Sequence, residues 1–354
     1  MKRKIWLSML ACMLVVMVVL SGCASKKDPK ESVQAAMENA LKMNSYELTG
    51  SLKINELSVN DPALEQDPAA GMVLNLLKNA EVNVSGVFQK DPMQMEMTLE
   101  VKLQGDMAIT LSVPMVITED KMWMKIPNIP MLGLPESMVD KFIEIDMKKL
   151  AEEQDADLNV GALDFTKSQE LSQELTKVVL GGFDGKTFFS DVNVKEAGLP
   201  EGVDAKQVVK FDITDSNLEQ AVTVFVKDVL PQILDLMSSD KYKDMFQLQQ
   251  EEIDKLKKEI SDEAELKKAL EELKKAVKIN QFSITTAVSK DDYPVYQDVN
   301  ANLDITNEGT TVKLGLQASS QYSKINEKVE FKIGIPTDVI TMEELEQQFN
   351  SFGM

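Results

Sequence analysis

The chain has 354 residues, a formal net charge of -20 and no histidine. A protein this acidic repels the phosphates of nucleic acid, which excludes that class of partner. Without histidine, the Ser-His-Asp and Cys-His catalytic arrangements and the commonest zinc ligand are missing as well. We therefore expect a protein that is not an enzyme and has no metal site and no cofactor. An enzyme here would need carboxylates, lysine or tyrosine alone.

The first residues are typical of an exported protein. Residues 2–4 are basic, and residues 5–20 form an apolar segment shorter than the roughly 20 residues that a spanning helix needs. The small Ser-Gly pair before Cys23 resembles the bacterial lipobox, in which the signal peptidase cuts just before a lipidated cysteine. This implies a signal peptide at 1–22 and a diacylated Cys23 anchored in the outer, extracytoplasmic face of the cell membrane. The alternative is a plain signal peptide or anchor helix that happens to contain a cysteine.

A short tether, residues 23–30, leads into the first predicted helix. Its three lysines are expected either to rest against anionic headgroups or to form a merely soluble linker. Residues 28–31, Asp-Pro-Lys-Glu, read as an N-cap, a proline in the first turn and a capping glutamate. Apolar residues then recur at helical spacing, which predicts an amphipathic helix to about Met43.

Alternating patterns that begin at Tyr46 and Val82 predict two strands, separated by an insertion rich in Asp, Pro and Ala. The clearest pattern is at 93–117, where apolar residues occupy every odd position on both sides of a Gly105-Asp106 turn. This predicts a long antiparallel hairpin with one wet face, whose other face must be buried against helices, another sheet or a ligand. The candidates to line a ligand cavity are Met93, Met95, Met97, Leu99, Val101, Met107, Ile109, Leu111, Val113 and Met115.

The 21 methionines of the chain admit three interpretations. Methionine fills irregular gaps in an ordinary core, and it also adapts to a variable lipid chain. Thioethers suit Cu(I) as well, but the alternation that starts at Met93 continues through Leu99, Val101 and Leu103, which favours an apolar face over a copper site.

Helical patterns dominate the middle of the chain. Residues 166–180 predict one helix, and a capping box at 216–219 predicts another that Pro231 kinks. Residues 241–277 are helical and heavily charged, with a narrow apolar stripe that suits helices lying over a surface. A coiled coil would need longer heptad repeats. We therefore expect a helical insertion near 215–277.

About a dozen strands are predicted in two blocks on either side of these helices. The remaining ones are at 121–126, 142–145, 187–194, 208–213, 282–288, 295–305, 312–318 and 329–333, and a last short helix is at 342–349. Because no segment has the composition of a long linker, the blocks are expected to join into one sheet. Two domains, or a distant duplication of the strand block, are the alternatives.

This order of elements resembles the lipoprotein-localisation fold of the LolA carrier and of the mycobacterial LppX and LprG lipoproteins, and more closely that of uncharacterised lipoproteins of Gram-positive spore-formers. The resemblance is carried by residues 33–54, 118–126 and 283–302, including Tyr293-Pro294-Val295. It implies a single α+β domain at 31–354, in which helices cover the concave face of a curved antiparallel sheet, an incomplete β-barrel. A hydrophobic cavity between them would hold acyl chains.

Two functions follow as expectations. The first is a membrane-anchored lipoprotein that binds a lipid or another hydrophobic ligand, as a carrier does. The alternative is a non-enzymatic envelope scaffold with a solid core, which would meet a protein partner through the charged helices at 241–277. In both cases Cys23 connects the protein to the membrane.

Overall fold

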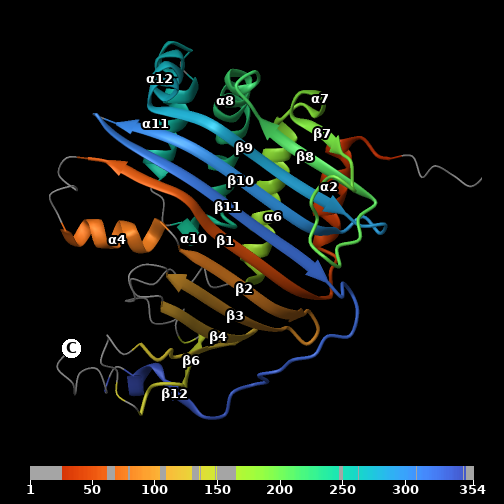
Figure 1. The fold of residues 1–354 in the computed structure, drawn as a ribbon, viewed down its shortest axis with the longest axis vertical. Coiled ribbons are helices and arrows are strands. Elements are labelled where there is room, and N and C mark those ends of the chain that lie inside the picture. Colours follow the sequence, from red (N-terminus) through yellow and green to blue (C-terminus); the bar gives the residue numbers. More distant parts are fainter. Residues whose placement is uncertain are drawn as a thin grey trace, which may run out of the picture.

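The structure is a computed structural model that describes residues 26–61, 68–78, 80–103, 109–129, 135, 137–147, 149, 165–246, 250–261, 263–307, 309–345 and 347. The expected signal peptide, Cys23 and Met107 lie outside these residues. Twelve strands form one sheet, which joins the two predicted strand blocks. The sheet is curved and unclosed, with helices packed on it, as Figure 1 shows. The expected α+β architecture is thereby confirmed.

The strands are β1 (Ser45–Asn60), β2 (Glu81–Gln89), β3 (Gln94–Leu103), β4 (Ile109–Thr118), β5 (Lys121–Lys125), β6 (Phe142–Asp146), β7 (Phe189–Val192), β8 (Gln207–Ile213), β9 (Val277–Val288), β10 (Pro294–Asn307), β11 (Thr310–Ser323) and β12 (Val339–Thr341). Their order is β12-β6-β5-β4-β3-β2-β1-β11-β10-β9-β8-β7. The first and last strand blocks meet where β1 pairs with β11. All pairs are antiparallel except β12 with β6.

The helices are α2 (Pro29–Ala40), α4 (Pro68–Lys78), α6 (Phe165–Gly182), α7 (Gly185–Phe188), α8 (Leu218–Val224), the π-helix η3 (Phe225–Val229), α9 (Leu230–Met237), α10 (Lys243–Phe246), α11 (Gln250–Ser261) and α12 (Glu263–Ala276). Asp28 caps α2 as predicted, because its side chain accepts hydrogen bonds from the N–H groups of Lys30 and Glu31. In Figure 1, α6, α8, α10, α11 and α12 lie behind the sheet, and α4 lies beside β1.

The strand register produces one apolar face that runs from β5 to β8. Across the middle of the sheet, Val82 lies opposite Leu52 and Val101, and further pairs continue the row into β4 and β11. Near β8, this face is covered by α2, α6 and η3, which pack around Phe211. This face of the sheet, from β5 to β8, is called the apolar face below. The ends of the strands near Ser45 are called the tether end, because α2 begins there, and the ends near Asn60 are called the far end.

The prediction of a wet opposite face is wrong between β3 and β6. Glu96, Val116 and Trp123 follow one another across the register on that face, and each is at most 5% exposed. The carboxylate of Glu96 accepts hydrogen bonds from the backbone of residues 332–334. Alternation along one strand cannot anticipate a distant segment that covers its polar side.

That distant segment corrects a second prediction. Residues 329–333 alternate like a strand, yet they form no strand in the structure. The N–H groups of Lys332 and Ile333 donate to the Glu96 side chain instead of to a neighbouring strand. The chain from Ser323 to Val339 therefore forms a strap, residues 324–338, that connects β11 to β12.

The structure also refines four smaller details of the predicted elements. The insertion before Val82 contains α4, whose proline suits the first turn and whose residues from Met72 to Leu77 are mostly apolar. The strand predicted from Thr187 starts two residues later, because α7 precedes it. The capping box is absent, since Asn217 is the N-cap and its side chain bonds Thr214 and Asp212. The predicted kink is a π turn just before Pro231.

Candidate functional site

The middle of the apolar face is neither buried nor fully exposed. On β2, β3 and β4 the side chains of Val84, Leu99 and Val113 lie in one register row, and all three are half-buried. Leu52 on β1 is 43% exposed. A partly exposed apolar patch of this kind can mark a binding site.

The predicted lining residues are not all equivalent in the structure. Met95 is 5% exposed and packs in a core cluster with Met43, Tyr46 and Phe88, so it belongs to the protein's own core. Met93 and Met97 pack against the same cluster. All the other described candidates are half-buried, namely Met93, Met97, Leu99, Val101, Ile109, Leu111, Val113 and Met115. Met107 lies outside the described residues.

The core cluster around Met95 closes the tether end of the apolar face. The rings of Tyr46 and Phe88 stack with their centroids 5.0 Å apart, and Tyr322 meets Tyr46 edge to face at 5.3 Å. Ile325 from the strap packs against the cluster as well. Burial raises the pKa of both Tyr46 and Tyr322, so both phenols are neutral at physiological pH. This end of the face is therefore closed by uncharged, interlocked rings.

Exposed apolar side chains also lie near the far end of the sheet. Ile305, near the end of β10, is 36% exposed, and on α4 Val73 is 54% and Leu77 is 40% exposed. The end of α4 lies beside β1. The N–H of Ala80 donates to the carbonyl of Leu77, and the N–H of Ile54 on β1 donates to the carbonyl of Ala80. α12 packs on β9 and β10 rather than over the middle strands. The predicted helical insertion therefore contributes helices that pack on the sheet, α12 among them.

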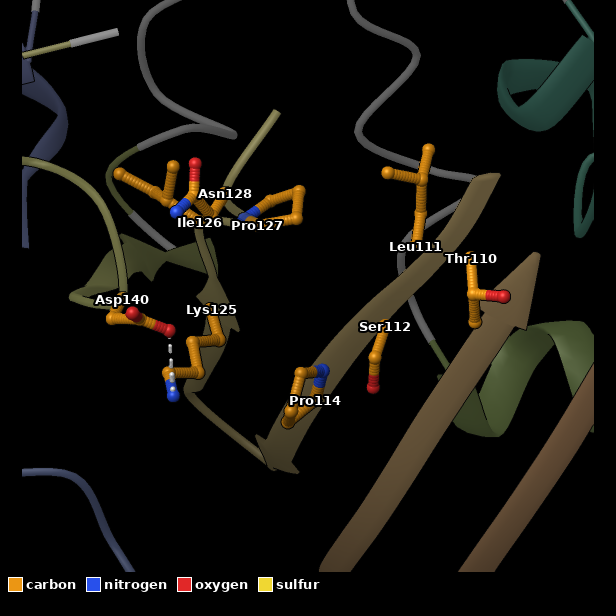
Figure 2. Close-up of a pocket in the computed structure, with 9 residues that line it drawn as sticks. All are labelled: Thr110, Leu111, Ser112, Pro114, Lys125, Ile126, Pro127, Asn128 and Asp140. Atoms are coloured by element: carbon orange, nitrogen blue, oxygen red, sulfur yellow. Dashed lines mark ion pairs between the residues drawn. The ribbon is translucent and has the colours of Figure 1, made fainter. Parts of the chain in front are cut away.

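A pocket of about 240 Å³ lies at the far end of β4 and β5 (Figure 2). Its polar lining residues Thr110 and Ser112 belong to the face opposite the half-buried row, and an ion pair joins Lys125 Nζ to Asp140 Oδ1 at 3.1 Å. This pocket is smaller and more polar than a usual site for a hydrophobic ligand. Of the predicted lining residues, only Leu111 contributes to it.

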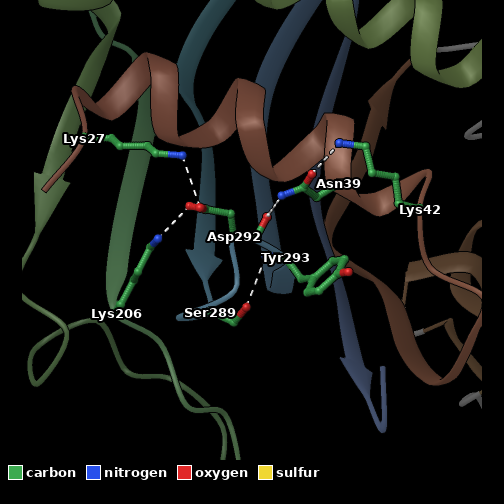
Figure 3. Close-up of polar contacts among 7 residues, drawn as sticks. All are labelled: Lys27, Asn39, Lys42, Lys206, Ser289, Asp292 and Tyr293. Atoms are coloured by element: carbon green, nitrogen blue, oxygen red, sulfur yellow. Dashed lines mark hydrogen bonds and ion pairs between the residues drawn. The ribbon is translucent and has the colours of Figure 1, made fainter. Parts of the chain in front are cut away.

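The start of the folded chain is attached firmly to the tether end (Figure 3). Lys27 Nζ lies 3.1 Å from Asp292 Oδ2, and Lys206 Nζ lies 2.6 Å from Asp292 Oδ1. The hydrogen bonds and charges of Lys206 and Lys27 lower the pKa of Asp292 below its ordinary value. The buried Gln207 also donates to the backbone carbonyl of Lys27 at 3.0 Å.

Two of the three tether lysines are held by the body of the protein, a third possibility beside contact with lipid headgroups and a soluble linker. Lys27 is paired with Asp292, and Lys30 Nζ donates to the carbonyls of Gly181 and Phe183 at 3.2 and 2.7 Å. Lys30 thereby satisfies carbonyls at the C-terminal end of α6. Only Lys26 of the three stays exposed without a contact that assigns it to the body. Sequence reasoning missed this because the partners lie about 150 to 265 positions away.

The described residues were also compared with the requirements of a metal site and of a membrane-spanning helix. They contain no group of three Asp, Glu, His or Cys residues that could hold a metal ion. No helix among these residues is both long enough and apolar enough to cross a bilayer.

One family model matches part of the chain. It is a family of unknown function, DUF6612, and it matches residues 236–344. The matched part extends from the end of α9 through α12 and β9 to β12, and so includes the strap. No curated protein matches the chain.

Proposed function

We propose that this protein is a membrane-anchored, extracytoplasmic lipoprotein that binds the acyl chain of a lipid on its apolar face. Cys23 would carry the anchor, as the lipobox resemblance implies. The observation that supports binding is the half-buried row of Val84, Leu99 and Val113 on an otherwise well-packed sheet. Each methylene group of a ligand buried there would contribute about 0.8 kcal/mol.

Flexible side chains at the edge of this row suit a ligand of variable shape. Met97 and Met115 lie opposite each other next to Leu99 and Val113, and both are half-buried. Methionine has an unbranched, polarisable side chain that adapts to different apolar partners. A carrier of lipids with differing chain lengths would use such a border.

The scaffold alternative would use the charged helices at 241–277. On α11, Ile253 is 2% exposed and attaches the helix to the body, whereas Leu256 is 46% exposed. The charged side of these helices would remain the surface for a protein partner.

The test is binding of a fatty acid that carries a dansyl group. After removal of the signal peptide Trp123 is the only tryptophan, so energy transfer from Trp123 to the dansyl group reports binding. The protein is used as the full lipidated chain, reconstituted in phosphatidylcholine vesicles. We expect saturable transfer with the wild-type protein and a loss of about tenfold in affinity with Leu99→Glu, because a charge would lie on the apolar face.

Thr98→Glu is the matched control. Thr98 is the adjacent residue on β3, half-buried like Leu99 but on the opposite face. It should leave the affinity within about twofold, since it does not alter the apolar face. The absence of saturable transfer with the wild-type protein, or equal losses in both variants at equal folding stability, would contradict the proposal.

A further inference from the structure

Segments that are distant in the sequence meet at the tether end around Asp292 (Figure 3). The carboxylate of Asp292 pairs with Lys27 Nζ at 3.1 Å, and its backbone carbonyl accepts a hydrogen bond from Asn39 Nδ2 of α2 at 3.2 Å. The hydroxyl group of the next residue, Tyr293, accepts a hydrogen bond from Asn326 Nδ2 at 3.0 Å. The tether, the end of α2, the β9–β10 turn and the start of the strap therefore form one surface. We call it the tether-end surface, which comprises residues 26, 27, 39–42, 206, 289–293 and 324–327.

The tether-end surface is basic, although the protein as a whole is acidic with 38 basic and 58 acidic residues. Its charged residues are Lys26, Lys27, Lys42, Lys206, Lys290 and Lys324 against Asp291, Asp292 and Glu327. All six lysines are exposed. Even when Glu47 is added, because it pairs with Lys324 at 2.8 Å, six positive charges stand against four negative ones. This excess favours contact with the phosphates of lipid headgroups.

The same surface presents one large apolar side chain. Leu41 is 39% exposed at the C-cap of α2, and Lys42 follows it directly. Lys42 Nζ donates to Asn39 Oδ1 at 2.9 Å, and Asn39 contacts Asp292, so both residues lie close to the point where the tether is held. An exposed leucine beside lysines suits the membrane interface, where the apolar side chain meets the acyl boundary and the ammonium groups meet the phosphates.

The short tether limits how far this surface can lie from the bilayer. Lys27 is four positions after Cys23, and four extended residues span at most about 14 Å. Lys27 is held on the body by its pair with Asp292 and by Gln207 Nε2, which donates to its backbone carbonyl at 3.0 Å. A lipid on Cys23 would therefore keep the tether-end surface close to the headgroups of the same membrane.

We infer that the tether-end surface binds the phosphate headgroups of the membrane that holds the Cys23 lipid, with its lysines at the phosphates and Leu41 at the boundary with the acyl chains. The inference rests on the anchor in the proposed function, but it does not depend on lipid binding by the apolar face. It gives the molecule a fixed orientation. Because β1, β9, β10 and β11 all have their tether ends at this surface, these strands would lead away from the membrane.

The test compares two leucines of equal exposure at different distances from the tether. Leu41 is 39% and Leu77 is 40% exposed. Leu77 ends α4 close to Ile54, and Ile54 is about 30 Å along β1 from Ser45 for an extended strand. The processed chain has no cysteine besides Cys23, so L41C and L77C each add a single free thiol for a bimane label.

Each labelled, lipidated protein is reconstituted in vesicles of phosphatidylglycerol and phosphatidylcholine that also contain a lipid with a nitroxide on its headgroup. We expect the nitroxide to quench L41C at least about threefold more strongly than L77C, because quenching needs close approach and only the first site lies near the anchor. Adding K42Q and K290Q to L41C should lower its quenching by about twofold, since attraction to the phosphates is weakened.

A second measurement uses the unlabelled wild-type protein and so does not depend on how the variants fold. A membrane-impermeant acetylating reagent should modify Lys42 and Lys290 about threefold more slowly in phosphatidylglycerol vesicles than in phosphatidylcholine vesicles. Lys313 is exposed on β11 near the far end and should react at the same rate in both.

Flotation of the protein with the vesicles separates the two possible failures. If the protein floats, equal quenching of L41C and L77C, or equal slowing at all three lysines, would overturn the inference and leave the anchor intact. If it does not float, the anchor at Cys23 fails and the inference fails with it.

Discussion

Glu96 on β3 binds Gly334 of the strap, because Glu96 Oε1 accepts a hydrogen bond from the N–H of Gly334 at 2.6 Å. Its other oxygen accepts from the N–H groups of Lys332 and Ile333 at 2.7 and 2.9 Å. Three successive N–H groups that converge on one anion form a nest, and the positive φ of Gly334, 69°, is a conformation that glycine adopts at little cost. A carboxylate on β3 thereby fixes the strap that connects β11 to β12.

Replacing Glu96 should therefore destabilise the fold. In Glu96→Gln one oxygen becomes an NH₂ group, which faces an N–H donor, and we expect a loss of about 1–3 kcal/mol in the free energy of unfolding. Glu96→Ala should cost at least as much, because all three N–H groups lose their acceptor. Urea unfolding measures both. Glu100→Gln, four residues further along the same face of β3, is the control and should change stability by less than about 0.5 kcal/mol. If Glu100→Gln lowers the free energy of unfolding as much as Glu96→Gln does, the three hydrogen bonds to Glu96 make no special contribution to stability.

Two neighbouring glycines at the end of α6 should respond in opposite directions to the same change. A Cβ on Gly182 would lie 2.4 Å from Val229 Cγ2 of η3, whereas a Cβ on Gly181 would meet nothing within 4 Å. Gly182→Ala should destabilise the protein by about 1–3 kcal/mol through overpacking. Gly181→Ala should be neutral or stabilising by up to about 1 kcal/mol, because alanine favours the helix. Thermal unfolding of the two variants distinguishes them, and a stabilised Gly182→Ala would mean that α6 and η3 are not in close contact.

Met95 and Leu99 are separated by four residues on β3 but should have different roles. Met95→Ala removes a core side chain and should lower the unfolding free energy by about 2–4 kcal/mol. Leu99→Ala removes a half-buried side chain, so it should cost less than about 2 kcal/mol and should weaken binding of the dansyl fatty acid. Unfolding and fluorescence titration of both variants check this. The interpretation fails if Leu99→Ala proves the more destabilising change and leaves binding unaltered.

The ion pairs of Asp292 should affect stability in a defined pH range. Its folded-state pKa is lowered, chiefly by the hydrogen bond from Lys206 and then by Lys27, so its contribution is present above its unfolded pKa, near 4. The contribution is lost as the pH falls from there through the folded pKa. Because all three side chains are partly exposed and screened by solvent, it should be about 1 kcal/mol.

Asp292→Asn tests this at constant backbone geometry, since asparagine tolerates the positive φ of 61° found there. Unfolding free energies of the variant and the wild-type protein should differ at pH 7 and converge near about pH 2. A difference that persists at low pH would assign the effect to the backbone or the turn instead of to the ion pairs.

The elements that the sequence predicts well are those that depend on local patterns. The alternation at 93–117 predicts β3 and β4 and the side of each that faces inward, and the cap at Asp28 predicts the start of α2. Both follow from the geometry of a few consecutive residues. The candidate lining could be listed from the same alternation, but its division between core and open surface could not, because Met95 and Leu99 have the same local pattern.

By itself, then, the sequence determined most of the strands, their apolar side, and the exclusion of histidine-based chemistry, because these depend on residue type and short-range periodicity. The tertiary structure alone decided what each side of the sheet meets. Glu96 is placed by its strand on the polar side, and only the distant strap turns it into a buried ligand of three N–H groups. Likewise, Lys27 forms an ion pair with Asp292, which lies far away in the sequence. Contacts between residues hundreds of positions apart depend on how the whole chain packs, and no local pattern contains that information.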